Sequence, residues 1–401
     1  MRILFLTQWF QPEPFFKGLP FAKKIQARGH EVEILTGFPN YPGGKLYPGY
    51  RLRFFQREMI EGVPVNRVAL FPSHDRSGLR RIITYLSFSI SALLIGPFMV
   101  KKPDVVYVYN LITLAWAAVV FRKISGCKIV YDVQDLWPES VRNSGMLNSR
   151  VAQSLLGKWC CWAYRQADKI AVLSPGFKEA LVKRGIAEER IEVIYNWCDE
   201  AGGTTQEGAG DLAPTFGLKE TFNIVFAGTM GLMQGMDTVL EAACLCRKEI
   251  PALRFVLVGG GVELERLKSK AKALMLENVV FIPRQPMHEM KKIWALADVL
   301  LVHLVDDPLF RITIPSKTQA YLATGTPILM AVRGDSAALI HEIGAGIVCA
   351  PENPDEMLLA IKELYGMPPE ERKRRGLNGK LFYDRFLSFD IGCEKFLRLF
   401  S

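Results

Sequence analysis

The chain has 401 residues, of which 49% are hydrophobic and 23% charged, and this composition excludes a disordered or collagen-like protein. At roughly 100 to 200 residues per domain, the length predicts two domains, each with its own core. The formal net charge is +9, but residues 1–200 hold 27 Lys and Arg side chains against 17 Asp and Glu, whereas residues 201–401 hold 23 against 24. Because folding does not require this asymmetry, we expect an anionic partner for the N-terminal half.

Short apolar runs alternate with amphipathic stretches along the first half, a pattern typical of βαβ units with parallel strands. The N-terminal run has no small-residue cleavage site, so we interpret it as a first strand rather than a signal peptide. The predicted strands of this half are Ile3–Leu6, Glu31–Leu35, Val105–Tyr109, Lys128–Tyr131, Ile170–Leu173 and Val193–Tyr195.

Residues Ile82–Val100 form a stretch of nineteen residues without a formal charge, long enough to be considered as a membrane span. Five basic residues flank this stretch: Arg76, Arg80, Arg81, Lys101 and Lys102. A helix lying on an anionic membrane surface fits the pattern best, because the flanking cations can contact lipid headgroups. A spanning helix and a plain buried helix are the alternatives.

The strand pattern restarts after a polar, Gly- and Thr-rich stretch at residues 200–211. The predicted strands of the second half are Asn223–Phe226, Arg254–Val258, Val279–Ile282, Val299–Val302 and Pro327–Met330. We therefore predict an α/β protein with two doubly wound domains, at residues 1–199 and 218–377, joined by a linker at residues 200–217. Open α/β sheets bind ligands at the carboxyl ends of their strands.

Lys17 and Gly18 stand between the first strand and the following helix. Free N–H groups and the helix dipole favour an anion at a helix start, so both residues are candidates for phosphate binding. An ordinary turn with a solvated lysine is the alternative.

Asp132, Gln134, Asp135 and Glu139 lie in a segment that directly follows a predicted strand. Carboxylates at this end of a strand can accept hydrogen bonds from sugar hydroxyls, which makes them candidate functional groups. Helix capping by Asp135 is the structural alternative.

In the second half, Gly228, Thr229 and Gln234 lie in a glycine-rich turn between a strand and a helix. Glycine allows the backbone to approach a ligand, and the two polar side chains can donate hydrogen bonds. The turn has neither the dinucleotide fingerprint nor the P-loop lysine, and close backbone packing is the alternative for its glycines.

Ser316 and Lys317 begin a later helix, and Arg284 follows a predicted strand. A lysine in the first turn of a helix is unfavourable unless an anion lies beside it, so Lys317 indicates an anion at this position. Arg284 is a further cation that could contact the same anion.

Metal and disulfide chemistry are disfavoured by the sequence. The eight cysteines have no C-x-x-C pair or zinc spacing, and the five histidines lie far apart. We therefore expect no metal and a reducing, cytoplasmic compartment. Basic residues are not interleaved with RNA-type aromatic motifs, so we expect no nucleic-acid partner.

Seven motifs carry a resemblance to a known family: Arg28-Gly-His-Glu-Val32, Thr36-Gly-Phe-Pro-Asn-Tyr-Pro-Gly-Gly44, Asp132-Val-Gln-Asp-Leu-Trp-Pro-Glu139, Leu173-Ser-Pro-Gly176, Asn196-Trp197, Gly231-Leu-Met-Gln-Gly235 and Pro315-Ser-Lys317. Together they resemble retaining glycosyltransferases of family 4, and the WbuB-like branch of bacterial surface-polysaccharide synthesis in particular. The resemblance covers essentially the whole chain, and its most specific motif begins at Asp132.

This resemblance implies the GT-B fold, in which two Rossmann-like domains face a central cleft and a last helix, here within residues 378–401, crosses back to the first domain. The N-terminal domain would bind the acceptor. The C-terminal domain would bind a nucleotide-sugar donor, commonly UDP-linked and here carrying an N-acetylated or deoxy hexose, without a metal or other cofactor. The Arg and Lys that usually clamp the diphosphate correspond to Thr229 and Gln234, and the usual ribose-binding carboxylate corresponds to Ala320.

Without the usual clamp, Lys317, Lys17 or Arg284 would have to balance the diphosphate charge. Asp135, with Asp132, Gln134 and Glu139 near it in sequence, would orient sugar hydroxyls. We expect a peripheral enzyme on the cytoplasmic face of a membrane, acting on a polyprenyl-diphosphate-linked or other lipid-linked acceptor. The alternatives are a nucleotide-sugar epimerase of the same fold and a non-catalytic scaffold subunit.

Overall fold

The computed structural model describes residues 1–73, 78–143, 149–198, 212–286 and 289–401, and the chain divides into two compact units. Unit 1 comprises Met1–Tyr195 and Gly392–Ser401, and unit 2 comprises Asn196–Ile391. The sequence places the first division after residue 199 and the start of the returning helix at residue 378, whereas the structure divides the units after residues 195 and 391. Most of the expected linker at residues 200–217 lies outside the described residues.

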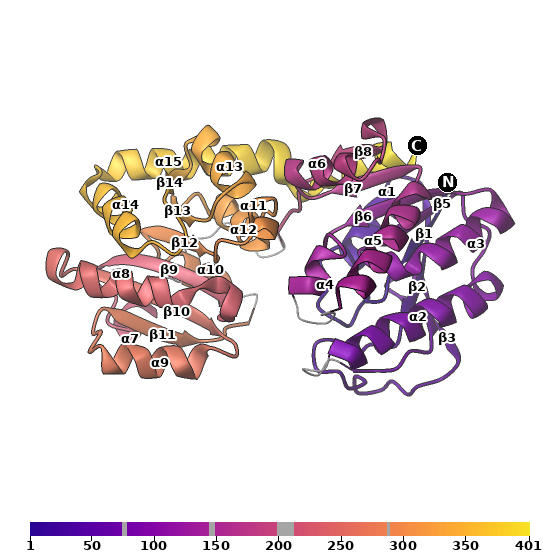
Figure 1. Ribbon diagram of the computed structural model, residues 1–401, viewed down its shortest axis with the longest axis horizontal. Helices are drawn as coiled ribbons and strands as arrows, with labels where there is room; N and C mark the ends of the chain where they lie inside the picture. Colours follow the sequence, from indigo (N-terminus) through magenta and orange to yellow (C-terminus); the bar gives the residue numbers. More distant parts are fainter. Residues whose placement is uncertain (74–77, 144–148, 199–211, 287–288) are drawn as a thin grey trace. The chain divides into compact units, whose positions relative to one another are not determined.

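Within the described residues, unit 1 is built on an eight-stranded sheet in the order β3-β4-β2-β1-β5-β6-β7-β8 (Figure 1). Neighbouring strands are parallel, apart from the antiparallel pair β3 and β4. The strands are β1 (Arg2–Leu6), β2 (Glu31–Gly37), β3 (Phe55–Ile60), β4 (Val63–Val68), β5 (Val105–Tyr109), β6 (Lys128–Val133), β7 (Lys169–Val172) and β8 (Ile191–Val193). The central strands are almost entirely buried, which explains their continuous apolar sequences.

The helices of unit 1 connect and cover these strands. They are α1 (Leu19–Ala27), α2 (Gly78–Met99), the 3-10 turn η1 (Ile112–Leu114), α3 (Ala115–Ser125), α4 (Glu139–Asn143), α5 (Arg150–Arg165), α6 (Pro175–Lys183), the turn η2 (Glu188–Arg190) and α16 (Phe389–Phe400). The last of these, α16, packs on the sheet through Phe396 and Phe400, whose rings lie 5.6 and 5.7 Å from that of Tyr107 in β5.

The helix α2 has large apolar side chains on its buried face and on its exposed face. One face, including Phe88, Ala92 and Gly96, is buried, and the helix packs against α3, β2 and β4. The other face exposes large apolar side chains, with Leu94 62% and Phe98 86% exposed. Its length and hydropathy would allow it to cross a membrane, but here it is one of the helices packed against the sheet of unit 1.

Unit 2 contains a six-stranded parallel sheet in the order β11-β10-β9-β12-β13-β14, counted over the part of the chain that the structure describes. The strands are β9 (Phe222–Thr229), β10 (Leu253–Gly260), β11 (Val279–Pro283), β12 (Val299–His303), β13 (Ile328–Ala331) and β14 (Gly346–Val348). One side of the sheet packs into an apolar cluster that includes Phe226, Leu257 and Leu301. The two parallel, Rossmann-like sheets confirm the predicted α/β class.

The helices of unit 2 are α7 (Leu212–Thr215), the turn η4 (Leu232–Gln234), α8 (Met236–Glu249), α9 (Leu264–Ala273), α10 (Met290–Trp294), α11 (Pro308–Arg311), α12 (Ser316–Thr324), α13 (Asp335–Ile343), α14 (Pro354–Gly366), α15 (Pro369–Phe382) and the π-helical turn η6 (Tyr383–Leu387). Near the end of the sheet, β9 and β10 approach so closely that a Cβ atom on Gly259 would lie 1.9 Å from the carbonyl oxygen of Gly228. Glycine is therefore required at position 259.

Candidate active site

The order of strands in each sheet reverses at one place, and α/β proteins bind ligands at such switch points. In unit 1 the switch lies between β1 and β5, and in unit 2 it lies between β9 and β12. The predicted residues Lys17, Asp132 and Asp135 lie near the first switch, and Gly228 and Thr229 lie at the second.

Asp132, at the end of β6, is buried and accepts three hydrogen bonds. The donors are Lys17 Nζ at 2.6 Å, the Tyr107 hydroxyl at 2.6 Å and Gln134 Nε2 at 2.5 Å. Burial lowers the pKa of Lys17, and the adjacent Asp132 carboxylate partly offsets this effect. A buried, paired ammonium holds the loop after β1 against the end of β6.

This arrangement corrects the expected role of Lys17 and Gly18 as phosphate ligands. The Lys17 side chain is 0% exposed and its charge is balanced by Asp132, so it has no free cation to offer a diphosphate. Beside it, the Gln11 side chain fills the space next to Gly18 and accepts a hydrogen bond from the Leu19 N–H at 2.8 Å. The start of α1 is thus occupied by the protein itself.

Glu139 also has a structural partner. Arg184 donates one hydrogen bond to Glu139 Oε2 and another to the carbonyl oxygen of Trp137, both at 2.6 Å. The pair braces the segment that follows β6, and the Glu139 side chain stays partly exposed, so its contact with a sugar remains a prediction.

Asp135 differs from Asp132 and Glu139 because solvent reaches its side chain. Asn110 Nδ2 donates a hydrogen bond to Asp135 Oδ2 at 3.0 Å. The dense protein around this accessible carboxylate raises its pKa, while the bond from Asn110 lowers it. Asn110 therefore fixes the position of Asp135, and the carboxylate of Asp135 is accessible to a ligand.

Sequence reasoning missed Asn110, which follows β5 and has a φ of 62°. Few residues other than glycine adopt this conformation, and asparagine is one of them. The sequence signal that could have identified Asn110 is an asparagine directly after a buried strand.

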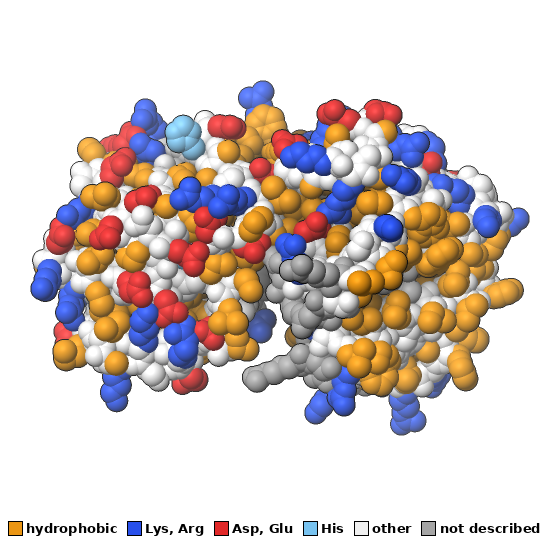
Figure 2. All heavy atoms as spheres, in the orientation of Figure 1, with side chains coloured by type: hydrophobic (Ala, Val, Ile, Leu, Met, Phe, Trp, Pro, Cys, Tyr) orange, Lys and Arg blue, Asp and Glu red, His pale blue; other side chains and the backbone are white. Residues whose placement is uncertain are grey.

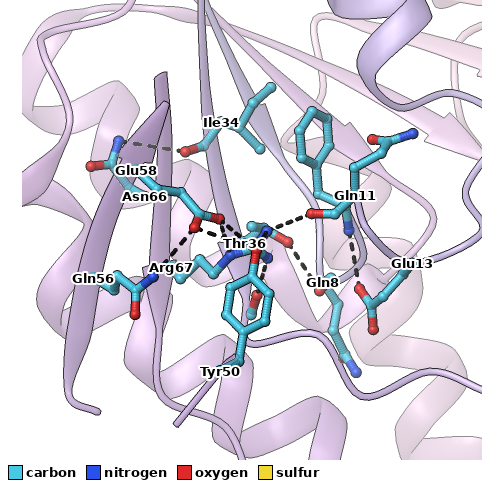
Figure 3. Close-up of polar contacts among 12 residues, drawn as sticks. Gln8, Gln11, Glu13, Ile34, Thr36, Tyr50, Gln56, Glu58, Asn66 and Arg67 are labelled. Carbon is cyan, nitrogen blue, oxygen red and sulfur yellow. Dashed lines mark hydrogen bonds and ion pairs between the residues drawn. The ribbon is translucent and has the colours of Figure 1, made fainter. Parts of the chain in front are cut away.

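A second group that sequence reasoning missed is centred on Arg67 in β4 (Figure 3). This fully buried guanidinium pairs with Glu58 and donates hydrogen bonds to the carbonyl oxygens of Gly37 at 2.9 Å and Gln11 at 2.5 Å. It therefore ties the loops after β1 and β2 together at the sheet edge.

Glu13 strengthens the same region by accepting hydrogen bonds from the backbone N–H groups of Phe10, Asn40 and Tyr41. Burial raises the pKa of Glu13, and these three bonds partly counteract the rise. The loops after β1 and β2 are thus fixed by buried polar contacts.

In unit 2, Lys317 lies in the first turn of α12 and points toward the end of β9. Its Nζ atom is buried and has no hydrogen-bond partner among the described residues. It lies 3.7 Å from the centre of the Phe226 ring and would lie 3.3 Å from a Cβ atom on Gly228. Burial without a nearby carboxylate lowers the pKa of Lys317 to about 7.

The other predicted residues of unit 2 are less closely grouped. Thr229 and Ser316 are exposed at the end of β9 and the start of α12. Gln234 Oε1 accepts a hydrogen bond from the Gly231 N–H at 2.9 Å, so this side chain braces the glycine turn. Arg284 is exposed after β11, the edge strand, and no described contact joins it to Lys317.

The predicted membrane residues lie at the ends of α2. Arg80, Lys101 and Lys102 are exposed and Arg81 is half-buried, whereas Arg76 lies outside the described residues.

Two families match the chain, one in each unit. Residues 19–197 match the family described as glycosyl transferase 4-like domain, and residues 216–382 match glycosyl transferases group 1. The chain belongs to the two-domain glycosyltransferases.

Named relatives and solved structures agree with this assignment. WcaI of Escherichia coli K12, named as a colanic acid biosynthesis glycosyl transferase, is 26% identical over 359 residues, or 86% of each chain. WbjE of Pseudomonas aeruginosa, named as a glycosyltransferase, is 30% identical over 250 residues, or 61% of each chain. HepE of Anabaena, solved with UDP-glucose, gives a TM-score of 0.69 at 16% identity, covering 99% of this chain and 98% of HepE. The last likeness confirms the GT-B fold, and the family matches confirm a transferase.

The buried pair in unit 1 can be tested by mutation. Lys17→Met should lower the free energy of unfolding by about 3–5 kcal/mol, because it leaves the Asp132 carboxylate buried and unpaired. Lys17→Met combined with Asp132→Asn should recover most of that loss. The matched control is Lys23→Met at an exposed ion pair, which should cost less than about 1 kcal/mol. Urea unfolding measures all three, and a similar small cost for both single variants would contradict the account.

The pKa of Lys317 also predicts a pH dependence. Because the pKa is lowered on folding, the unfolded chain binds more protons between pH 7 and 10, and stability rises with pH in that window. The free energy of unfolding of the wild type, relative to Lys317→Met, should therefore increase by roughly 1.4 kcal/mol per pH unit. Urea unfolding of both proteins from pH 7.5 to 9.5 measures this difference. Parallel stability curves would show that the ammonium is solvated in the folded protein.

Proposed function

We propose that the protein is a retaining glycosyltransferase that moves a sugar from a nucleotide-diphosphate donor to a lipid-linked saccharide acceptor in surface-polysaccharide synthesis. The observation that carries the proposal is the ammonium of Lys317, buried without a counter-ion at the start of a helix and beside a glycine-rich strand end. Such a group is poorly stabilised until an anion binds it.

A diphosphate suits this site in both charge and shape. The dipole of α12 favours an anion near its N-terminus, and Gly228 leaves room for a ligand next to Lys317 Nζ because it has no side chain. UDP is the nucleotide we propose, and an N-acetylated or deoxy hexose is the sugar. The UDP-glucose complex of HepE, a protein of the same fold, supports UDP as the nucleotide to test first.

Asp135 is the group we propose for orienting the sugars. It is the accessible carboxylate of the segment after β6, and Asn110 fixes its position. The carboxylates of Asp132 and Glu139 are engaged by Lys17 and Arg184, and we propose no nucleophilic role for either.

We therefore propose front-face transfer with retention. The bond between the anomeric carbon of the donor and its phosphate oxygen breaks, and the acceptor hydroxyl oxygen bonds to the same face of that carbon. The leaving phosphate takes the proton of the hydroxyl, and Lys317 stabilises the charge that develops on the diphosphate. No step requires a metal or another cofactor.

The surface of unit 1 supports the acceptor and the location that we propose. Figure 2 shows hydrophobic side chains gathered over the part of unit 1 that contains α2 and α3, with Lys and Arg around them. Phe54, in the loop before β3, adds a side chain that is 82% exposed. An apolar surface with basic neighbours favours peripheral binding to the cytoplasmic face of an anionic membrane.

The name of WcaI, which refers to colanic acid, supports a role in surface polysaccharide. The WbuB-like branch stays a prediction.

Donor binding tests the proposal. Calorimetry with UDP and UDP-sugars should give saturable binding, and Lys317→Met should weaken it by at least about tenfold, because the diphosphate loses its nearest cation. Lys248→Met, at an exposed lysine near the end of α8, is the matched control and should bind as the wild type does. Transfer to polyprenyl-diphosphate-linked saccharides should give a product with the anomeric configuration of the donor.

Each alternative function has its own outcome in these assays. If the protein forms epimerised sugar from the donor alone, it is an epimerase and not a transferase. If UDP-, GDP- and dTDP-sugars do not bind at millimolar concentration, the remaining hypothesis is a non-catalytic scaffold subunit. An inverted product would overturn the retaining mechanism while keeping the transferase.

A further inference from the structure

An apolar groove of about 380 Å³ lies on unit 1 between the helices α2, α3, α4 and α5. Its walls include Leu86 and Ile90 of α2, Trp116 of α3 and Trp159 of α5. The volume lies in the range of sites for small organic ligands. The groove is separate from the donor site, which is in unit 2.

The groove offers a ligand almost nothing but hydrocarbon and aromatic surface. Two hydroxyl-bearing side chains in its wall, Ser89 and Thr113, bond to each other at 2.8 Å, and Ser89 also donates to the carbonyl oxygen of Tyr85. With these groups satisfied inside the protein, the groove favours an apolar chain over a sugar or a peptide.

One end of the groove reaches the candidate active site of unit 1. Tyr85 and Trp137 both line the groove, and their ring centres are 6.2 Å apart. Trp137 is two residues beyond Asp135, and the Asp135 carboxylate is close enough to raise the pKa of the Tyr85 hydroxyl, although burial raises it more. A chain in the groove would therefore have its head near Asp135.

A cation lies at the same end. Arg81 precedes Tyr85 by one helical turn, and its positive charge acts on the Tyr85 hydroxyl. The Arg81 Nε atom is buried and has no hydrogen-bond partner among the described residues. Guanidinium groups bind phosphate strongly through paired N–H donors.

We propose that this groove holds the hydrocarbon chain of the lipid-linked acceptor and that Arg81 contacts the phosphate joined to that chain. The inference rests on the proposed function and adds the position of the lipid. Charge complementarity supports this occupant over another protein, because residues 78–103 contain four Lys and Arg and no Asp or Glu.

The chain would enter from the membrane side, since Leu86 and Ile90 are 47% and 55% exposed at the groove. The acceptor phosphate would then lie between the groove and Asp135, which would contact the saccharide.

Farnesyl diphosphate, a soluble prenyl diphosphate, is the probe for this site. It should bind saturably to the full-length protein and change the tryptophan fluorescence, because Trp116, Trp137 and Trp159 line the groove. Leu86→Gln and Ile90→Gln should each weaken binding on the order of tenfold. Leu79→Gln and Leu94→Gln, at exposed positions of α2 outside the groove wall, should change it less than about twofold.

Arg81→Gln separates the phosphate contact from the chain contact. It should weaken binding of farnesyl diphosphate on the order of tenfold and leave binding of farnesol unchanged. An equal effect on both probes would overturn the role of Arg81. Thermal unfolding of each variant shows whether it has kept its fold.

Three further results would overturn the groove proposal. They are no saturable binding of farnesyl diphosphate, equal weakening by groove and control variants, and equally tight binding of monomeric dihexanoyl phosphatidylglycerol, which would make the groove a site for bilayer lipid. UDP binding is measured on the same preparations. If UDP binds while the prenyl probe does not, the lipid position fails alone, and if none of the UDP-, GDP- and dTDP-sugars binds, the proposed function fails.

Discussion

A buried ammonium without a counter-ion is the constraint on which the site of unit 2 depends. Lys317 lies at the start of α12, where the helix dipole opposes a cation, and its Nζ atom has no hydrogen-bond partner among the described residues. The apolar core of unit 2 contributes the free energy that offsets this unfavourable position. A bound diphosphate would reverse the balance, since the same burial that lowers the pKa of Lys317 strengthens its attraction to an anion.

Unit 1 uses a buried lysine in the opposite way. Lys17 is fully buried, whereas Lys317 is half-buried with a buried Nζ atom, and the charge of Lys17 is balanced by Asp132 at 2.6 Å. The pair, the Arg67 cluster and the three bonds accepted by Glu13 all join loops at the carboxyl edge of the sheet. Asp135, by contrast, is exposed and accepts a hydrogen bond from Asn110.

Much of the fold could be predicted from the sequence, because buried parallel strands have continuous apolar runs that stand out between amphipathic helices. The hairpin of β3 and β4 was missed because β3 is an edge strand whose residues alternate between exposed and half-buried, so it has no continuous apolar run. A signal was present in Glu61-Gly62, where both residues have positive φ and form the tight turn that joins two strands. β14, with three residues, is too short to give a pattern.

The site was less predictable, because its contacts join distant parts of the chain. Lys17 and Asp132 are 115 positions apart, so a local pattern could suggest phosphate binding for the lysine without showing its partner. Lys317 was predicted from a local rule on helix charge, and the structure places it beside a glycine that leaves room for a ligand. The groove of unit 1 combines several helices and could not be inferred from any one of them.

The central claim is that Lys317 receives the diphosphate of the donor, and the titration of its ammonium tests this most directly. Nuclear magnetic resonance of the lysine side chains, with Lys317→Arg to assign the signal, gives its pKa with and without saturating UDP. The account predicts a pKa near 7 in the free protein and a rise of about 1–3 units with UDP. A pKa that does not change when UDP binds would contradict it.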